Sequence, residues 1–215
     1  MYTEARYDFR VSYPALPKGR HSLTRYEVRA AQRDKLLRGM AEVVAEQGYV
    51  PTSVADVLRR AHVSRETFYQ QFANKEECFL ATLDQCAQTV LDLVAGSVGD
   101  GDTALARFDR GLAVYLATLA EQWPVTRTFF VECYAAGAAA TQRRFAAQER
   151  FAHVLAANFA DAPAWQRLPD KRFAALSLAA ALSSLVTAAV AANEPARVIA
   201  LHRPVMELVR HLFGP

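Results

Sequence analysis

The sequence has few of the residues that build disulfides, metal centres and nucleophilic active sites. Its three cysteines, Cys78, Cys86 and Cys133, show no two-cysteine metal or redox spacing. Its five histidines are scattered, and HExxH, GxSxG and a glycine-rich phosphate loop are all missing. We therefore expect no enzyme, no metal, no other cofactor and no disulfide framework. Cys78 and Cys86, eight apart on one expected helix, are interpreted as small buried apolar residues rather than thiol sensors.

The sequence also lacks strand-like alternation and a secretion signal. The first 25 residues carry charges and no apolar run of seven or more, so we expect a cytoplasmic protein. Phe173 to Ala192 carry no charge, but alanine and serine dominate the stretch and charged residues crowd its ends. We interpret it as a helix buried on all sides, with no membrane as partner. With 52% apolar and 22% charged residues, the chain has the composition of a soluble protein.

The charge is unevenly distributed along the chain. Residues 1–75 carry 13 Lys and Arg against 8 Asp and Glu, a net charge of +5. Residues 76–215 carry 12 against 14, a net charge of −2. A surface that binds phosphates needs such a basic excess, so the N-terminal third is the expected DNA-binding part.

Residues 52–75 have the pattern of two short helices joined by a tight turn. From Thr52 to Ala61 the apolar residues recur at the spacing of one helical face, and Ser64 then caps a second helix. Phe68 and Phe72 lie four residues apart and are expected to point inward. The residues left outward carry groups that can pair with guanine, adenine or phosphate. They are Arg65, Thr67, Tyr69, Gln70 and Gln71.

A longer ordered set of residues extends this pattern. It comprises Gly48-Tyr49, Thr52, Val54, Val57, Ala61-His62-Val63-Ser64, Thr67-Phe68-Tyr69, Phe72 and Asn74-Lys75-Glu76. The set resembles the helix-turn-helix of the TetR family of transcriptional regulators. The resemblance covers residues 27 to about 83 at the level of motif, and beyond them only length and helical character.

Two positions depart from the family pattern. His62 stands where the family usually has glycine, the residue that adopts a positive φ at the lowest cost. Glu66 stands where a small residue is common. It either reads a cytosine amino group, caps the helix or points away from the phosphates.

Helical periodicity along the chain, without any competing strand pattern, predicts an all-helical fold of about nine helices. We expect a basic flexible arm over residues 1–25, a helix-turn-helix DNA-binding domain over 26–74 and a helical ligand-binding and dimerisation domain over 75–215. The arm either contacts DNA, packs on the body or is a free terminus. The expected function is that of a transcriptional regulator, a repressor by resemblance, bound as a homodimer to an inverted-repeat operator. The expected DNA-binding residues are Arg25, Thr52, Ser53, Ser64, Arg65, Thr67, Tyr69, Gln70, Gln71 and Lys75.

Similar regulators enclose a small-molecule cavity between the connecting helix and the last two helices. In this sequence the aromatic residues of that region are the expected lining of a cavity for a mostly apolar effector. They are Phe108, Tyr115, Trp123, Phe130, Tyr134 and Phe151, with Glu132 and His153 as further polar groups.

In the same family the last two helices pair across a two-fold axis. The expected dimerisation residues are Leu178, Leu182, Leu185, Val198, Leu201, Val205, Leu208 and Leu212. The alternative is that both helices only fill the core of their own chain. Pro204 is expected to kink or divide the last helix. For the whole protein, the alternative function is a helical protein-interaction module that does not read DNA by itself.

Overall fold

The described residues of the computed structural model, 24–97 and 102–213, form helices and no strand. The prediction of an all-helical fold is confirmed. The predicted arm lies outside the described residues except for its last two, Thr24 and Arg25, which cap and begin the first helix.

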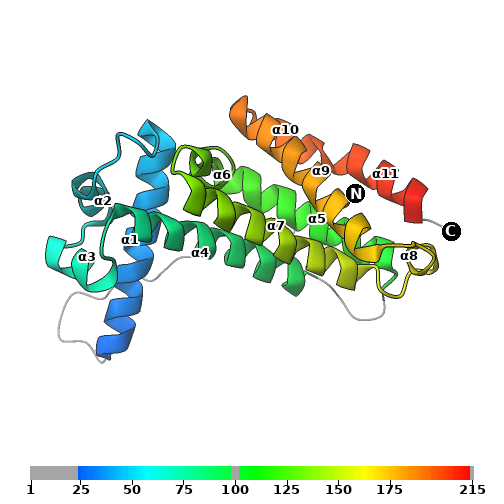
Figure 1. The fold of residues 1–215 in the computed structure, drawn as a ribbon, viewed down its shortest axis with the longest axis horizontal. Helices are drawn as coiled ribbons and strands as arrows, with labels where there is room; N and C mark the ends of the chain where they lie inside the picture. Colours follow the sequence, from blue (N-terminus) through cyan, green and yellow to red (C-terminus); the bar gives the residue numbers. More distant parts are fainter. Residues whose placement is uncertain (1–23, 98–101, 214–215) are drawn as a thin grey trace, which may run out of the picture.

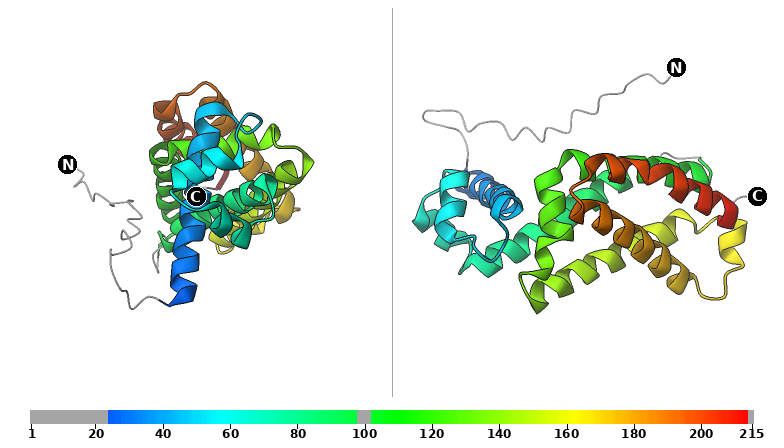
Figure 2. Two further views of the ribbon diagram at one scale, coloured as in Figure 1. Left: turned by 90° about the vertical axis from the view of Figure 1, so that its left-hand side faces the viewer. Right: turned by 90° about the horizontal axis from the view of Figure 1, so that it is seen from above.

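The molecule is elongated, with two lobes joined by a long helix (Figure 1). The N-terminal lobe contains α1 (Arg25–Gln47), α2 (Val54–Ala61) and α3 (Arg65–Gln71). From it α4 (Lys75–Gly96) runs into the C-terminal lobe, as a connecting helix should. Seen from above, the N-terminal lobe lies at one end of the molecule (Figure 2), with α1 in contact with α6.

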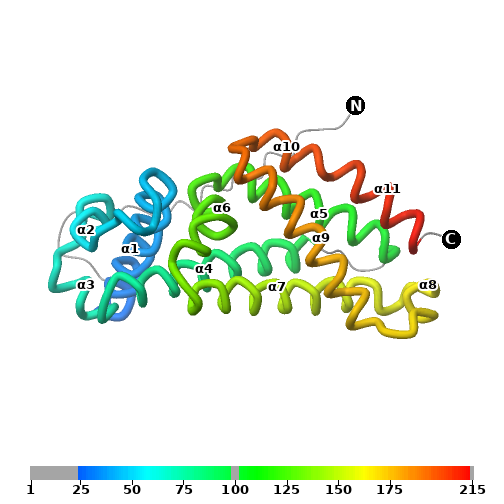
Figure 3. Tube along the Cα trace, turned by 45° about the horizontal axis from the view of Figure 1, so that its top comes forward, coloured from blue at the N-terminus to red at the C-terminus, as the bar shows by residue number. Residues whose placement is uncertain are grey.

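The C-terminal lobe is a bundle built around α4. It contains α5 (Ala104–Glu121), α6 (Trp123–Phe130), the 3-10 turn η1 (Glu132–Tyr134), α7 (Ala138–Asn158), α8 (Pro163–Gln166), α9 (Lys171–Ala191), α10 (Pro195–Ala200) and α11 (His202–Phe213). The tube in Figure 3 shows α7 alongside α4 and α9 crossing α7, and both pairs are in contact.

Side-chain caps explain where the helices of the N-terminal lobe begin. The hydroxyls of Thr24 and Ser53 accept the backbone N–H of Glu27 and Asp56, and those carboxylates accept the N–H of the cap residues. Asn74 accepts the N–H of Glu77 at the start of α4. Each cap satisfies backbone donors that have no partner inside the helix.

The last helical segment is divided, as Pro204 predicted. One helix ends at Ala200 and the next begins at His202, with Leu201 between them. Proline has no N–H to offer the carbonyl of Ala200, four residues earlier, so a continuous helix would leave that carbonyl unpaired. Pro204 instead lies in the first turn of α11, where the missing donor costs nothing.

One large aromatic side chain of α7 points away from the core. Phe145 is 56% exposed. The face that α7 buries instead contains Ala140, Arg144, Ala147 and Leu155. The contacts of α7 with α4 on one side and α9 on the other determine which of its faces is buried. The spacing of apolar residues in the sequence does not determine this by itself.

Among the described residues, α9 is the one helix long and apolar enough to cross a membrane by length and composition, with a mean hydropathy of 2.0. In this fold α9 packs against α6, α7 and α10. Its exposed positions include Ser177, Ala181, Ser184 and Ala188, which form a stripe of small side chains.

Candidate nucleic-acid interface and ligand cavity

The turn between α2 and α3 is made by His62. This residue has φ 53° and ψ 46°, the left-handed conformation that glycine adopts most cheaply. The N–H of Val63 reaches back to the carbonyl of Leu58, 3.3 Å away, and closes the end of α2. The positive φ expected from the resemblance is present. Here a histidine adopts it, at a cost in conformational free energy that glycine would avoid.

Two phenylalanines fix the rotation of α3. Phe68 and Phe72 are 0% and 2% exposed, and their ring centroids lie 5.7 Å apart. The amide of Gln71 adds a hydrogen bond of 3.1 Å to the carbonyl of Arg29, which ties α3 to α1. With this face held inward, the opposite face of α3 is exposed at Arg65, Tyr69 and Gln70.

The serines at the helix starts are caps. Ser64 accepts the N–H of Thr67 at 3.1 Å, and the two hydroxyl oxygens lie 2.9 Å apart. Ser53 hydrogen-bonds with its side chain and its N–H to the carboxylate of Asp56, and these bonds lower the pKa of Asp56. Ser53 and Ser64 both remain exposed, so capping leaves them accessible to a phosphate.

Thr52 requires a correction. Its side chain is 2% exposed, and its hydroxyl donates to the carbonyl of Gly48 at 2.7 Å. It fastens the end of α1 to the loop before α2, so we withdraw the predicted DNA contact from this side chain. Lys75 is also engaged inside the lobe, because its ammonium donates to the carbonyls of Tyr49, Val50 and Thr52.

The two lobes are joined by polar contacts as well as by α4. The carboxylate of Glu132, in η1, accepts the backbone N–H of Tyr49 at 3.1 Å. The hydroxyl of Thr128, in α6, donates to the carbonyl of Ala41 at 2.9 Å. The first contact is partly buried and the second is buried, so a shift of α6 and η1 would also displace α1 and the loop before α2.

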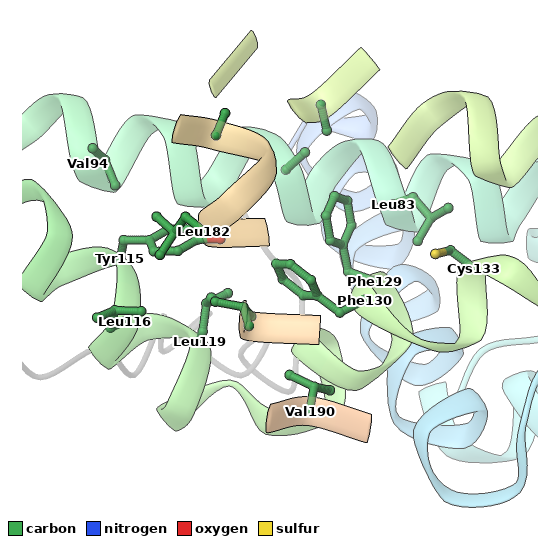
Figure 4. Close-up of a cluster of buried hydrophobic side chains, with 14 of the residues drawn as sticks. Leu83, Val94, Tyr115, Leu116, Leu119, Phe129, Phe130, Cys133, Leu182 and Val190 are labelled. Atoms are coloured by element: carbon green, nitrogen blue, oxygen red, sulfur yellow. The ribbon is translucent and has the colours of Figure 1, made fainter. Parts of the chain in front are cut away.

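Five helices of the C-terminal lobe enclose a mostly apolar cavity. It holds about 560 Å³ of space free of atoms, part of it open to solvent, and its walls come from α4, α5, α6, α7 and α9. Tyr115, Phe130 and Phe151 line it, and Tyr115 stacks on Phe151 with ring centroids 5.0 Å apart. Figure 4 shows Tyr115, Phe129 and Phe130 within the buried cluster around it.

Comparison with known proteins agrees with this arrangement. The family model for bacterial regulatory proteins of the tetR family matches residues 36–82, from the middle of α1 into α4. This match confirms the predicted resemblance of the segment to the tetR family. The matched segment contains the helix-turn-helix described above and the capped start of α4.

Two curated relatives from Bacillus subtilis match part of the chain. The uncharacterized HTH-type transcriptional regulator YxbF is 27% identical over 88 residues, which is 40% of this chain and 23% of the relative. The uncharacterized HTH-type transcriptional regulator YvdT is 30% identical over 70 residues, 32% of this chain and 36% of the relative. The matches thus span only about a quarter to a third of these relatives.

Solved structures of tetR-family regulators share the whole fold. The fatty acid degradation regulator FadR from Bacillus halodurans has a TM-score of 0.72 at 19% identity, over 82% of this chain and 96% of that one. FadR from Bacillus subtilis, solved in complex with stearoyl-CoA, has a TM-score of 0.72 at 18% identity, over 85% of this chain and 98% of that one. At these identities the likeness concerns the fold.

The fold does not bring all the predicted ligand residues together. Tyr115, Phe130 and Phe151 line the cavity, and Phe108 lines a second cavity on the other side of Phe151. Two predictions are corrected. Tyr134 is 52% exposed and lines neither cavity, and Trp123 donates its indole N–H to Asn193 at 2.9 Å. Of the further polar groups, Glu132 contacts Tyr49 and His153 is exposed, so neither faces the cavity.

The predicted dimerisation residues divide into three groups by burial. Leu182, Val198 and Val205 are 2%, 0% and 6% exposed, so for these three the alternative of an intrachain core holds. Leu185, Leu208 and Leu212 are 46%, 52% and 52% exposed and are free to meet a partner. Leu178 and Leu201 are partly buried against the core.

Sequence reasoning missed the one charged residue that the described part of the chain contributes to the cavity wall. Arg144 is 4% exposed and lines the cavity. An indication was present in the sequence, because Arg144 lies at helical spacing with Ala140, Ala147 and Leu155, and that face becomes the buried one.

Proposed function

We propose that the chain is a cytoplasmic transcriptional regulator that binds double-stranded DNA through α3. The observation that carries this proposal is the division of α3 into two faces. Phe68 and Phe72 are locked in the core, while Arg65, Tyr69 and Gln70 project from the opposite, exposed face. Arginine and glutamine can pair with guanine and adenine in the major groove, and a tyrosine hydroxyl can donate to a phosphate. Ser53, Ser64, Thr67, Gln71 and Arg25 complete the proposed DNA-binding set, with residues 26–74 as the DNA-binding domain.

The proposed regulator acts as a homodimer on an inverted repeat. Exposed leucines on α9 and α11 and the small-residue stripe of α9 support an interface in which the helices of two protomers approach closely. Burial in that interface would cover the face of α9 that its own protomer leaves exposed. A two-fold dimer presents two copies of α3, so the operator has two half-sites related by the same symmetry.

The proposed effector is a small, mostly apolar molecule that releases the repressor from DNA. The enclosed apolar cavity supports this, as does the FadR structure, in which a similar fold holds stearoyl-CoA. Residues 75–215 form the proposed ligand-binding and dimerisation domain. A ligand that fits only one position of α4 and α6 changes the spacing of the two α3 helices through the Glu132 and Thr128 contacts. The effector changes the free energy of DNA binding by the difference between its own binding free energies for the two states.

Repeated selection from a random-sequence DNA pool tests the function, with a salt series on the selected sequence. The regulator requires enrichment of an inverted repeat whose affinity falls steeply with salt concentration. If no sequence is enriched at low salt, the DNA-reading function fails. The alternative of a protein-interaction module then takes its place.

A further inference from the structure

A positively charged side chain lies buried in the cavity wall without a carboxylate partner. The Arg144 guanidinium is 4% exposed and lines the apolar cavity. Its Nη2 donates to the hydroxyl of Ser183, and its Nε has no hydrogen-bond partner. The guanidinium carbon lies 4.6 Å from the ring centroid of Phe130 and 5.0 Å from that of Phe129.

The arginine of the neighbouring cavity shows how such a charge is normally compensated. Arg107 lines the second cavity, and its guanidinium pairs with Asp161 at 2.5 Å and donates to the carbonyls of Asp102 and Asn158. No Asp or Glu of the described residues forms an ion pair with Arg144, and no carboxylate lines the cavity in front of it.

Burying a cation without a counter-ion costs free energy. Two aromatic faces and one hydroxyl stabilise the guanidinium only in part, because each attracts it more weakly than an anion does. Apolar residues of similar size would give a better core at this position. The arrangement is therefore suited to a group that arrives from outside with a negative charge.

We propose that the cavity binds an apolar carboxylic acid as its carboxylate, with the Arg144 guanidinium as the partner of the head group. The planar fork of arginine matches a carboxylate, and the free Nε provides one of the donors. The hydroxyl of Tyr115 and the amide of Gln148 belong to the same cavity wall and can supply further hydrogen bonds. This inference rests on the proposed effector function of the same cavity.

The second cavity gives the apolar part of the ligand a place to extend. Phe151 lines both cavities. The second one holds about 930 Å³ of space free of atoms, part of it open to solvent, and is lined by Phe108, Leu112 and Leu155 among others. Arg144 and Leu155 lie on the same helix eleven residues apart, about 16 Å along its axis. A flexible chain of about ten carbons, roughly 11 Å long when extended, reaches past Phe151, which lies about 10 Å from Arg144 along the helix, if the Phe151 ring turns aside.

The charge of the site favours a carboxylate over a phosphate ester. Arg144 is the one cation in the wall of the first cavity, and Arg107 in the second is already paired. One guanidinium balances one negative charge. A phosphate monoester carries nearly two negative charges, so part of its charge would remain without a partner in apolar surroundings.

The test is calorimetric titration of the full-length protein with decanoate, decanol and decanoyl-CoA. We expect saturable binding of decanoate and at least roughly 10-fold weaker binding of decanol, which lacks the charge. Equal or tighter binding of decanol would overturn the proposal without the use of any variant. Tighter binding of decanoyl-CoA than of decanoate would also overturn it, because the thioester has no carboxylate to place at Arg144.

Variants separate a binding role from a structural one. Arg144→Met should weaken decanoate binding at least roughly 10-fold, leave decanol binding unchanged and leave the thermal midpoint no lower than in the parent protein. Arg143→Met is the matched control, because Arg143 is the adjacent, exposed residue that pairs with Asp84. It should bind decanoate as the parent does. If Arg144→Met loses stability but keeps the preference for decanoate, Arg144 only supports the fold and the proposal fails.

Operator binding measured on the same preparations keeps the two proposals apart. A protein that binds its selected operator but not decanoate refutes the carboxylate site and leaves the regulator intact. A protein that binds decanoate through Arg144 but enriches no DNA sequence refutes the regulator and leaves the site intact.

Discussion

Lys75 holds the start of α4 against Tyr49, at the end of α1. Its ammonium lies 4.1 Å from the centroid of the Tyr49 ring and 3.0 Å from the Tyr49 carbonyl oxygen. The same group donates to the carbonyl of Thr52 at 2.9 Å. One side chain thus joins the connecting helix to the loop that leads into the helix-turn-helix.

We expect Lys75→Met to lower the free energy of unfolding by about 1 to 3 kcal/mol, because charged hydrogen bonds to three carbonyls are lost. Urea denaturation measures the change. Lys35→Met, at an exposed lysine of α1, should change it by no more than about 0.5 kcal/mol. A salt series on operator binding then tests the predicted phosphate contact of Lys75. If the contact forms, the variant's salt slope falls by about one, and an unchanged slope would leave Lys75 with its internal role alone.

His62→Gly should stabilise the protein by up to about 1 kcal/mol, because glycine adopts the observed φ of 53° without strain. His62→Val should destabilise it by about 1 kcal/mol or more, since a β-branched residue resists this conformation. Ala55→Gly is the control, at an exposed position within α2, and should cost about 1 kcal/mol. Urea midpoints give all three values. If His62→Gly and Ala55→Gly lower the urea midpoint by equal amounts, the backbone strain assigned to His62 is absent.

Substitutions on α3 should separate base reading from phosphate contact. Gln70→Ala should relax preference at one base pair of each half-site by about 1 to 3 kcal/mol. Tyr69→Phe should weaken binding to all sequences alike, because only the hydroxyl is removed. Gln85→Ala, at an exposed glutamine of α4, is the control. Competition assays against single-base operator variants measure these effects, and a uniform loss for Gln70→Ala would remove its base-reading role.

Leu208→Glu should convert a dimer into monomers, because it places a charge on the exposed apolar side of α11. Phe145→Glu is the control, since Phe145 is similarly exposed at 56% but lies on α7, away from the proposed interface. Light scattering after size exclusion gives the molar mass of each. A dimer that survives Leu208→Glu would move the interface elsewhere.

The three cysteines should resist alkylation in the native protein at neutral pH. Burial raises the pKa of the Cys78 and Cys86 thiols to about 12 and that of Cys133 to about 11, so little thiolate forms below pH 9. Cys86 keeps some exposed surface and lines the cavity, so it should react first, and decanoate should slow it. Mass spectrometry after timed iodoacetamide treatment measures each site. Rapid labelling of Cys78 or Cys133 would contradict their burial.

The sequence by itself determined the elements whose interactions are local. The caps at Ser53, Ser64 and Asn74 each bind a backbone group three residues away, and the spacing of Phe68 and Phe72 is read directly from the chain. The break near Pro204 also follows from local backbone chemistry, and the positive φ at His62 was expected from the family resemblance. The all-helical class and the helix-turn-helix could therefore be predicted.

Only the tertiary structure decided which side of each long helix is buried. Packing of α7 between α4 and α9 leaves Phe145 exposed and buries Arg144, which the sequence analysis did not select. The tertiary structure likewise determined that Leu182 and Val205 fill the core, while Leu185 and Leu208 remain exposed. In such alanine-rich helices several faces are apolar enough to be buried, so the choice depends on contacts between residues far apart in the chain. The buried, unpaired charge of Arg144 is a product of that choice.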